Sequence, residues 1–361
     1  MRHLTKEITI GNNKTSPKSI IKIGGNNKIA IQSMCTTKTK DVASTVKQIK
    51  ELEDLGCNII RVAVLNMDDA KAIKEIKKQI NIPLVADIHF DYKLALEAIE
   101  SGVDKLRINP GNIGSIENIT KVVNKCKEKH IPIRIGVNMG SLDKEIEKTY
   151  GRCAFSLVQS AKKHVKILED LDFYDIVLSL KASDVLTTIE AYKIASETFD
   201  YPLHIGVTEA GPTFNGLIKS GIALGDLLLN GIGDTIRISL TDDPKYEIIA
   251  AKELLSNLNL YNKISLTSCP TCGRSQTDLI PLVNEMQEFI NTLPNIKLHI
   301  AMMGCAVNGP GEAKDADIGI ACGINEALLF KKGEIIRKVT KDEIIPTLKN
   351  EILEYIKRNT D

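Results

Sequence analysis

The segment PLVADIHFDYKLALEAIESGVDKLRIN, residues 83–109, contains the pattern on which the predicted architecture rests. It opens with an apolar run, Pro83–Ile88, and closes with a second run, Lys105–Asn109. Between them, apolar residues from Asp91 to Ser101 recur at helical spacing, and Asp91 is suited to cap the helix. Short apolar runs on either side of an amphipathic helix are typical of buried parallel strands. The segment therefore predicts one β/α repeat followed by the next strand.

The same alternation of strand and helix runs through the first two-thirds of the chain. The other predicted strands are 28–34, 58–64, 132–137, 175–181, 202–207 and 235–240. Eight strands with intervening helices, in a length close to the roughly 250 residues of a (β/α)8 barrel, predict an α/β fold with a TIM-type barrel. A doubly wound open sheet is the alternative, and it is disfavoured because no Gly-rich dinucleotide fingerprint follows an early strand.

The pattern changes after the predicted last barrel helix, Asp243–Asn257. A short strand, a cysteine-containing turn, a helix, two further strands, a hairpin with Lys332-Gly333 at its turn and a closing helix are expected there. Such an arrangement is a small α+β domain. We expect a barrel domain over residues 1–258 and a second domain over residues 259–361.

The amino-acid composition disfavours several classes of protein. The 361 residues carry a net charge of +1, with 43% hydrophobic residues, 4% aromatic residues and no Trp. A near-neutral chain poor in aromatic residues is unlike a nucleic-acid binder. No apolar run is long enough to span a membrane, and the segment from Met1 to Glu7 has no signal-peptide character. We therefore expect a cytoplasmic protein without nucleic-acid or membrane partners, whose eight cysteines are free, catalytic or metal-bound.

Charged side chains occur at one parity of the predicted strands, near their carboxyl ends. These strand-end candidates are Arg61, Asp87, His89, Arg107, Asn109, Arg134, Asn138, Lys181 and Glu209. Residues of one parity share a face, and barrel enzymes bind ligands at the carboxyl ends of their strands. Several buried cations need a shared anion, so we predict a phosphate- or diphosphate-bearing substrate.

The acidic and imidazole groups of this set have more than one interpretation. Asp87 and Glu209 are expected to be ion-pair partners or acid/base groups. His89 is a proton donor, a phosphate contact or a packed residue at a strand end.

A cysteine motif, Cys269-Pro270-Thr271-Cys272-Gly273-Arg274, opens the second domain. Two thiolates at this spacing indicate zinc, a redox dithiol or an iron–sulfur centre. A thioredoxin-like motif belongs in an early βαβ unit, and a four-thiolate zinc site needs a second close pair that the sequence lacks. Cys305 lies in a Gly-rich segment, residues 302–312, whose backbone N–H groups are suited to approach sulfide. The fourth ligand is Glu312 of the same segment, or Cys322 at a predicted strand end.

Motifs along the entire chain resemble the bacterial two-domain form of the 4-hydroxy-3-methylbut-2-enyl diphosphate synthase family. The matching segments are 31–34 (IQSM), 86–90 (ADIHF), 107–112 (RINPGN), 134–138 (RIGVN), 180–183 (LKAS), 207–211 (VTEAG), 268–274 (SCPTCGR) and 304–312 (GCAVNGPGE). The resemblance implies a TIM barrel joined to an iron–sulfur domain. It implies reductive ring opening and dehydration of 2-C-methyl-D-erythritol 2,4-cyclodiphosphate, a step towards isoprenoid precursors.

The resemblance also implies cofactors, partners and roles for residues. One [4Fe–4S] cluster per chain is expected on Cys269, Cys272, Cys305 and Glu312. Ser268 and Arg274 are expected to join the barrel residues as substrate contacts, and Glu209 is expected near the reacting carbon. Family members are homodimers that take electrons from flavodoxin or ferredoxin.

Three other functions fit part of the sequence. One is a barrel phosphosugar enzyme with a structural zinc domain, which iron and sulfide analysis would distinguish. A second is a sulfite- or nitrite-type reductase, disfavoured because no further cysteine lies close to Cys305. A third is an iron–sulfur sensor or RNA-binding protein, disfavoured by the near-zero net charge.

Overall fold

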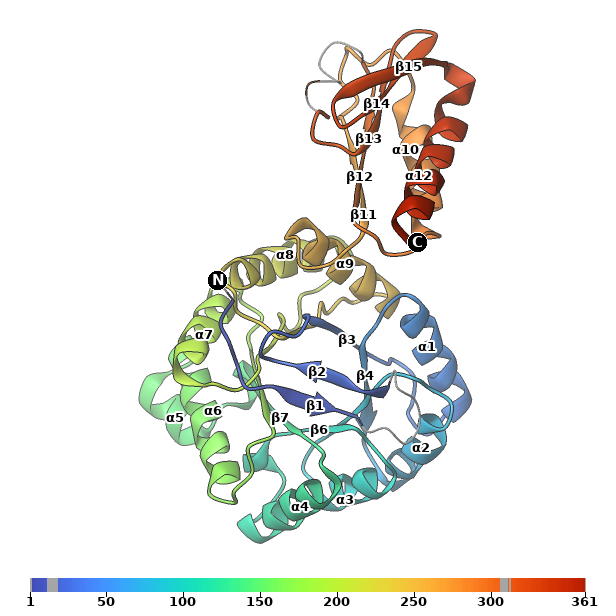
Figure 1. Ribbon diagram of the computed structural model, residues 1–361. Coiled ribbons are helices and arrows are strands. Elements are labelled where there is room, and N and C mark those ends of the chain that lie inside the picture. Colours follow the sequence, from blue (N-terminus) through green and yellow to red (C-terminus); the bar gives the residue numbers. More distant parts are fainter. Residues whose placement is uncertain (1, 12–18, 306–310, 312, 361) are drawn as a thin grey trace. The chain divides into compact units, whose positions relative to one another are not determined.

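The computed structural model describes residues 2–11, 19–305, 311 and 313–360. Its contacts divide the chain into two compact units, Met1–Leu260 and Tyr261–Asp361. Figure 1 shows both units, coloured along the sequence.

The first unit is a parallel barrel, as the sequence predicts. Its strands lie in the order β8-β7-β6-β5-β4-β3-β10-β9, and every neighbouring pair in this order is parallel. A parallel bridge between Leu178 and Leu203 joins β8 to β9 and closes the ring. The strands are β3 (Ala30–Met34), β4 (Ile59–Val64), β5 (Leu84–Ile88), β6 (Lys105–Ile108), β7 (Ile133–Asn138), β8 (Ile176–Lys181), β9 (His204–Ile205) and β10 (Thr235–Ile236).

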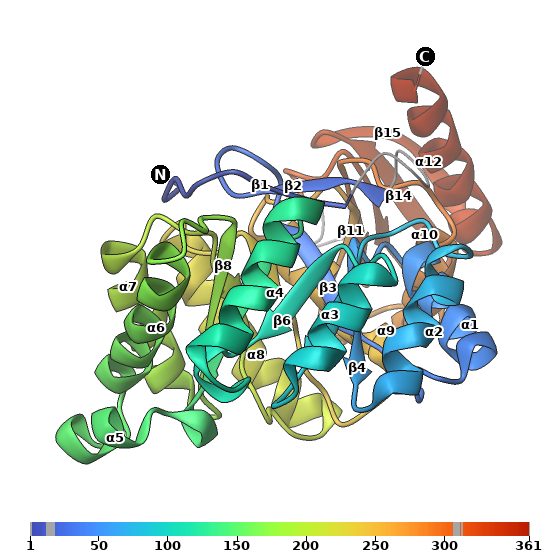
Figure 2. The same ribbon diagram turned by 90° about the horizontal axis from the view of Figure 1, so that it is seen from below.

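Helices cover the outside of this barrel (Figure 2). They are α1 (Val42–Asp54), α2 (Met67–Lys77), α3 (Tyr92–Glu100), α4 (Ile116–Lys129), α5 (Lys144–Tyr150), α6 (Ala154–Glu169), α7 (Val185–Thr198), α8 (Thr213–Leu229) and α9 (Pro244–Asn257), with short 3-10 turns η2 (Pro110–Asn112) and η3 (Met139–Ser141). Asp41, Asn66, Asp91, Ser115 and Asp184 cap five of these helices, each accepting a hydrogen bond from a first-turn N–H.

An antiparallel hairpin that the sequence reading missed lies across the amino-terminal end of the barrel. It consists of β1 (Ile8–Ile10) and β2 (Ile21–Ile23), and both views show it at one end of the strands (Figures 1 and 2). Its three buried isoleucines pack against residues near the starts of four barrel strands: Ala30, Ile59, Val85 and Val177. This contact forms an apolar floor under the barrel interior.

The second unit is an α+β domain built on one five-stranded sheet. Strands β11 (Ile264–Ser268), β12 (Leu298–Met303) and β13 (Ile318–Cys322) are parallel, and β14 (Glu326–Lys331) and β15 (Glu334–Thr340) extend the sheet as an antiparallel hairpin. Helices α10 (Leu279–Asn291) and α12 (Ile344–Thr360), with the 3-10 turn η4 (Lys341–Glu343), complete the unit. Ile300, Ile320, Met286 and Leu348 belong to its buried core.

No helix in the described part of the chain is long and apolar enough to cross a membrane.

Candidate active site

Polar side chains fill the carboxyl half of the barrel interior. Asp87 on β5, Arg107 on β6 and Arg134 on β7 are in register, so they project inward at one level. Asn138 and Lys181, two inward positions further along their strands, are also in register. A run of charged residues at this depth explains why the strand sequences alternate between apolar and cationic residues.

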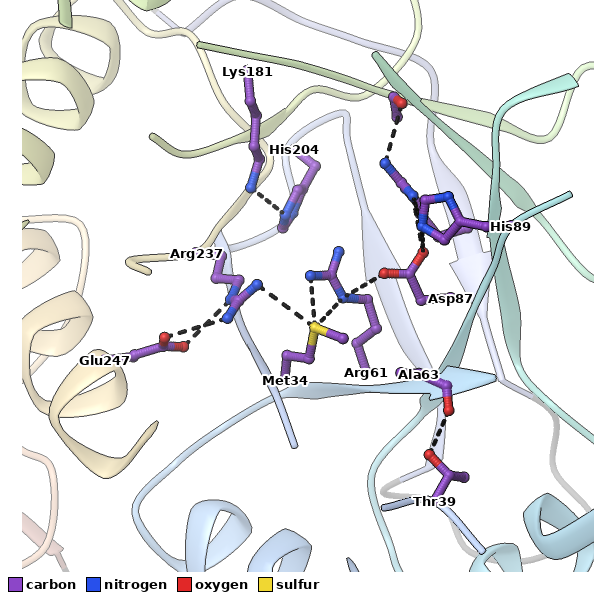
Figure 3. A network of polar contacts seen from close by, with 12 residues as sticks. Met34, Thr39, Arg61, Ala63, Asp87, His89, Lys181, His204, Arg237 and Glu247 are labelled. Atoms are coloured by element: carbon purple, nitrogen blue, oxygen red, sulfur yellow. Dashed lines mark hydrogen bonds and ion pairs between the residues drawn. The ribbon is translucent and has the colours of Figure 1, made fainter. Parts of the chain in front are cut away.

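Asp87 is the acceptor for one side of this layer (Figure 3). Its Oδ1 lies 3.0 Å from Arg107 Nη1 and 3.4 Å from His89 Nε2, and its Oδ2 lies 3.5 Å from Arg61 Nε. Arg107 Nη1 also lies 2.6 Å from His89 Nε2, and Arg107 Nη2 donates to the Gly136 carbonyl at 3.2 Å. One carboxylate thus orients two guanidinium groups and an imidazole.

A thioether lies between the Arg61 guanidinium and a further one, that of Arg237. Met34 Sδ accepts from Arg61 Nε at 3.0 Å and Nη2 at 2.8 Å, and Arg237 Nη1 approaches it at 3.8 Å (Figure 3). Arg237 is also paired with both carboxylate oxygens of Glu247, each at 3.3 Å. A soft, uncharged sulfur is a weak acceptor, so Arg61 retains capacity to bind an anion.

Lys181 and His204 form a third buried group. Lys181 Nζ lies 3.4 Å from His204 Nε2, and the other ring nitrogen lies 2.7 Å from Thr235 Oγ1. Burial and then the charges of Arg134 and Lys181 lower the pKa of His204 well below its ordinary value. His204 is therefore neutral, and Lys181 has no carboxylate partner within the described part of the chain.

The electrostatics of the layer favour an anionic ligand. Burial acts to raise the pKa of Asp87, but the charges of Arg61 and Arg107 hold it well below its usual value. Burial lowers the pKa of Arg61 to about 10, and burial with cationic neighbours lowers the pKa values of Arg134 and Lys181. Each cation would be stabilised by negative charge that Asp87 alone does not supply.

A cavity of about 410 Å³ opens above this layer, a volume suited to a small molecule. Five of the sequence-predicted site residues line it: His89, Arg107, Asn109, Asn138 and Glu209. Arg61, Asp87, Arg134 and Lys181 are not among its lining residues, and all but Arg61 are less than a tenth exposed. The structure therefore brings the predicted barrel residues together as a wall and a buried layer, which we name the cup.

Glu209 occupies an unusual backbone conformation at the rim of the cup. Its φ is +53°, in the left-handed region that residues other than Gly rarely adopt. The side chain is exposed and lines the cavity, directly after the short run that follows β9. Left-handed residues often lie at functional sites, where the surrounding structure maintains the strain.

The three cysteines of the predicted cluster lie at one edge of the second sheet. Cys269 directly follows β11, and Cys305 follows β12 after Gly304, with Ser268 and Met302 in register on these parallel strands. The Gly304 N–H donates to Cys269 Sγ at 3.1 Å. Cys272 and Arg274 are exposed in the turn that follows, and Ser268 is the exposed last residue of β11.

Two candidates remain for the fourth cluster ligand, Cys322 and Glu312, and the structure describes only the first. Cys322 is fully buried in the core of the sheet, and burial raises the pKa of its thiol to about 11. Glu312 lies outside the described residues. Within the part that the structure describes, no three His, Cys, Asp or Glu side chains are close enough together to hold a metal ion.

Comparison with known proteins gives a family match for each of the two units. Residues 5–252 match the family described as the GcpE TIM-barrel domain, and residues 265–354 match the GcpE protein C-terminal domain. The chain belongs to the GcpE family. The first matched region contains the residues of the cup, and the second contains the cysteine motif.

GcpE relatives span nearly the whole chain. A protein of Clostridium perfringens is 57% identical over 96% of this chain and 97% of its own length. One of Fusobacterium nucleatum is 55% identical over 94% and 97%, respectively. Both are named 4-hydroxy-3-methylbut-2-en-1-yl diphosphate synthase (flavodoxin).

A solved structure is similar to the barrel in fold alone. It is the dihydropteroate synthase from Stenotrophomonas maltophilia with active site-bound imidazole. Its TM-score is 0.50 at 10% identity, covering 67% of this chain and 94% of that one.

The cavity of this GcpE family member also contains residues that the sequence analysis did not select. Phe90, Asn112, Arg152, Ser183 and Thr208 line it beside the predicted ones. Ser183 and Thr208 lie just beyond β8 and β9 and continue the inward parity of these strands, which the alternation of the sequence already indicates. Arg152 lies between α5 and α6, where no strand or helix pattern indicates its position.

Proposed function

We propose that the chain is a 4-hydroxy-3-methylbut-2-en-1-yl diphosphate synthase, which converts 2-C-methyl-D-erythritol 2,4-cyclodiphosphate by ring opening, loss of water and two-electron reduction. The observation that carries this proposal is the 57% identity to a protein of that name over 96% of the chain. The cup supports it independently, because its buried cations need a multiply charged anion such as a diphosphate.

We assign the barrel residues two different roles in substrate binding. Arg107, Asn109, Asn138 and His89 line the cavity and are suited to contact the substrate directly. Arg61, Arg134 and Lys181 lie in the buried layer, where they supply positive charge to the diphosphate, and Asp87 orients Arg61 and Arg107. Glu209 is the rim carboxylate that we assign to proton transfer or charge stabilisation at the reacting carbon.

We infer that the second unit holds one [4Fe–4S] cluster on Cys269, Cys272, Cys305 and Glu312. Three observations support the fit. The thiol-bearing segments follow two neighbouring parallel strands, so they share one edge of the sheet. The Gly304 N–H already donates to Cys269 Sγ, as a backbone amide does to a cluster thiolate. A Cβ at Gly304 would lie 2.6 Å from Ser275 Oγ and 3.4 Å from Cys269 Sγ, so glycine permits this close approach.

The cluster would supply the two electrons and an iron with affinity for a substrate oxygen. This chain's own residues would hold the diphosphate, fix the ring beside Glu209 and exchange protons there. Ser268 and Arg274, which flank the cysteine pair, are the remaining proposed substrate contacts.

The proposal also includes the electron donor, the oligomeric state and the cellular compartment. Flavodoxin is the donor in the names of the relatives, and ferredoxin is the second candidate. We propose a homodimer on the basis of the family resemblance. The cytoplasm is supported by the cysteines, all eight of which are described and form no disulfide.

The direct test is anaerobic turnover of the cyclic diphosphate by the reconstituted chain with reduced flavodoxin, with product identified by mass spectrometry. Iron and sulfide analysis separates this enzyme from a zinc-containing barrel protein. Arg107→Ala should raise KM by roughly 10-fold to 150-fold, equivalent to a lost charged hydrogen bond. Zinc in place of iron, or no turnover by an intact cluster protein, would reject the proposal.

The fourth ligand has its own test. Glu312→Ala should lose iron and activity, because one iron is left without a protein ligand. Cys322→Ser should leave iron content and rate close to wild type, since Cys322 is buried in the sheet core. Electron paramagnetic resonance and iron analysis read out both variants. The opposite pattern would assign Cys322 as the ligand.

A further inference from the structure

Phe90 has a left-handed backbone in the connection that joins β5 to α3. Its φ is +64°, and the Asp91 N–H donates to the His89 carbonyl at 2.8 Å, a bond between residues i and i+2. A positive φ closed by such a bond is characteristic of the rare, strained form of the γ-turn. A bulky side chain is seldom found in this conformation, so the turn holds Phe90 in an unfavourable backbone geometry.

The length of the connection does not require this strain. The connection from β8 to α7, residues 182–184, is as long as the one from His89 to Asp91, and it also ends in a helix-capping aspartate, Asp184. None of the residues 182–184 has a positive φ. The same barrel therefore joins a strand to a helix over this length without a left-handed residue, and the strain at Phe90 has another cause.

The turn redirects the phenyl ring towards the cavity of the cup. Asp87 faces the barrel interior, so a regular continuation of β5 would give Phe90 the outward parity of Ile88, which is 1% exposed. Phe90 is instead 74% exposed and lines the cavity, and its ring centroid lies 5.8 Å from that of His89. Strained residues often lie at functional sites. The turn thus presents an apolar ring to the ligand cavity that would otherwise pack against the helices.

An apolar ring is unusual among the groups that line this cavity. Of the lining residues in the described part of the chain, only Phe90 and Met139 have apolar side chains. The polar ones offer charge or hydrogen bonds, which inorganic diphosphate satisfies as well as an esterified diphosphate does. Discrimination between two ligands that share an anionic group requires a contact that only one of them makes.

We propose that Phe90 determines the specificity of the cup by covering the methyl-bearing carbon ring of the substrate while the cations hold its diphosphate, an assignment that rests on the proposed function. The class of ligand selected in this way is a diphosphate joined to a compact, partly apolar carbon skeleton. Binding buries the exposed phenyl ring against that skeleton. This burial contributes affinity that free diphosphate does not obtain.

Calorimetric titration of the anaerobic, cluster-loaded chain with two ligands, the cyclic diphosphate and inorganic diphosphate, provides the test. Phe90→Ala should raise Kd for the cyclic diphosphate by roughly 10-fold to 30-fold, as for the loss of a partly buried ring, and change Kd for inorganic diphosphate by less than about twofold. Phe90→Leu retains an apolar side chain and should recover part of the loss. Leu229→Ala is the matched control, because Leu229 is 73% exposed at the end of α8 and does not line the cavity. That variant should bind both ligands like the wild type.

Phe90→Gly separates ligand contact from folding. Glycine adopts a positive φ freely, so this variant should gain about 2–4 °C in Tm and lose as much affinity for the cyclic diphosphate as Phe90→Ala does. An equal loss for both ligands, or no loss for either, would overturn the assignment of Phe90 and leave the proposed function intact. A wild-type chain that binds neither ligand would reject the proposed function, and the assignment of Phe90 with it.

Discussion

Glu209 combines an exposed carboxylate with a left-handed backbone. Its φ of +53° costs roughly 1–2 kcal/mol relative to a relaxed residue, and the neighbouring Ala210 is buried, which anchors the segment. The carboxylate is held at the rim of the cavity at this cost. Glu209 is therefore both the residue with the strained backbone and the residue to which we assign the acid/base chemistry.

We predict that Glu209→Gly raises Tm by about 2–4 °C while reducing kcat by roughly 10²–10⁴-fold, because glycine relieves the strain and removes the acid/base group. His130→Gly is the matched control, since His130 has a φ of +54° at the end of α4 and no role in the cup. That variant should gain stability and retain full kcat. Calorimetry and steady-state kinetics measure both effects. A Glu209→Gly protein that turns over normally would remove Glu209 from the chemistry.

Asp87 is the carboxylate on which the cation layer depends. Its low pKa means that it is ionised in the folded protein, and that its stabilising contribution would be lost only under strongly acidic conditions. Removing the charge leaves Arg61 and Arg107 buried without this carboxylate.

We predict that Asp87→Asn reduces the free energy of unfolding at pH 7 by about 3–5 kcal/mol, the typical cost of breaking a buried ion pair. Added inorganic phosphate should restore more stability to the variant than to the wild type, because it replaces the missing negative charge. Chemical denaturation with and without phosphate measures the difference. An equal response of both proteins to phosphate would contradict the view of Asp87 as a counter-charge.

The turn η2 depends on helix α6. A Cβ at Gly111 would lie 2.4 Å from His164 Cε1, so the turn that carries Asn109 and Asn112 packs directly on this imidazole. His164 is 4% exposed, and its Nδ1 has no partner among the described residues. Burial lowers its pKa from 6.5 to about 4, partly offset by the charge of Asp143.

Because the pKa of His164 is lowered in the folded protein, the free energy of unfolding depends on pH. Between pH 6.5 and 4 the unfolded chain binds a proton that the folded one does not, so stability is full above pH 6.5 and falls as the pH is lowered towards 4. Over this pH range, we predict that the free energy of unfolding falls by up to about 3 kcal/mol less in His164→Gln than in the wild type. His204 has a shift of the same sign and leaves a residual slope. Urea unfolding at several pH values tests this, with exposed His130→Gln as a control that should retain the wild-type slope. An unchanged slope in His164→Gln would contradict the assignment.

Periodic elements could be predicted from the sequence, and irregular ones could not. The alternation of apolar and cationic residues around Arg107 and Arg134 predicts both a strand and an inward-facing charge, because only a shared ligand makes such burial tolerable. The hairpin β1–β2 consists of two three-residue strands, too short for any period to be recognised. Arg152 reaches the cavity from a loop, and its position follows from the folded chain rather than from local spacing.

The proposed reaction couples the two units, because electrons from the cysteine domain must reach a substrate held in the barrel. If the protein is a dimer in which each site uses both chains, defects in different units should complement one another. We predict that mixing Arg107→Ala chains with Cys305→Ala chains restores about a quarter of the wild-type rate, from one intact site in half of the dimers. The rates are compared at a substrate concentration near the wild-type KM, where each variant alone should show little activity. Mixed dimers, verified by mass spectrometry, that show no activity would assign the complete site to a single chain.

The hairpin floor also has a consequence for how the chain is made. The amino terminus is fixed by a bond from His3 N to the Gly231 carbonyl and by the pair between Arg2 and Asp234, a partner 232 residues further along the chain. The hairpin strands leave the ribosome before the barrel strands, but the strands on which they pack extend to β8, and the anchors Gly231 and Asp234 are synthesised later still. These isoleucines therefore remain exposed through most of synthesis, when an apolar segment is prone to aggregate or to engage a chaperone. The first part of the barrel to be translated is the last to reach its place.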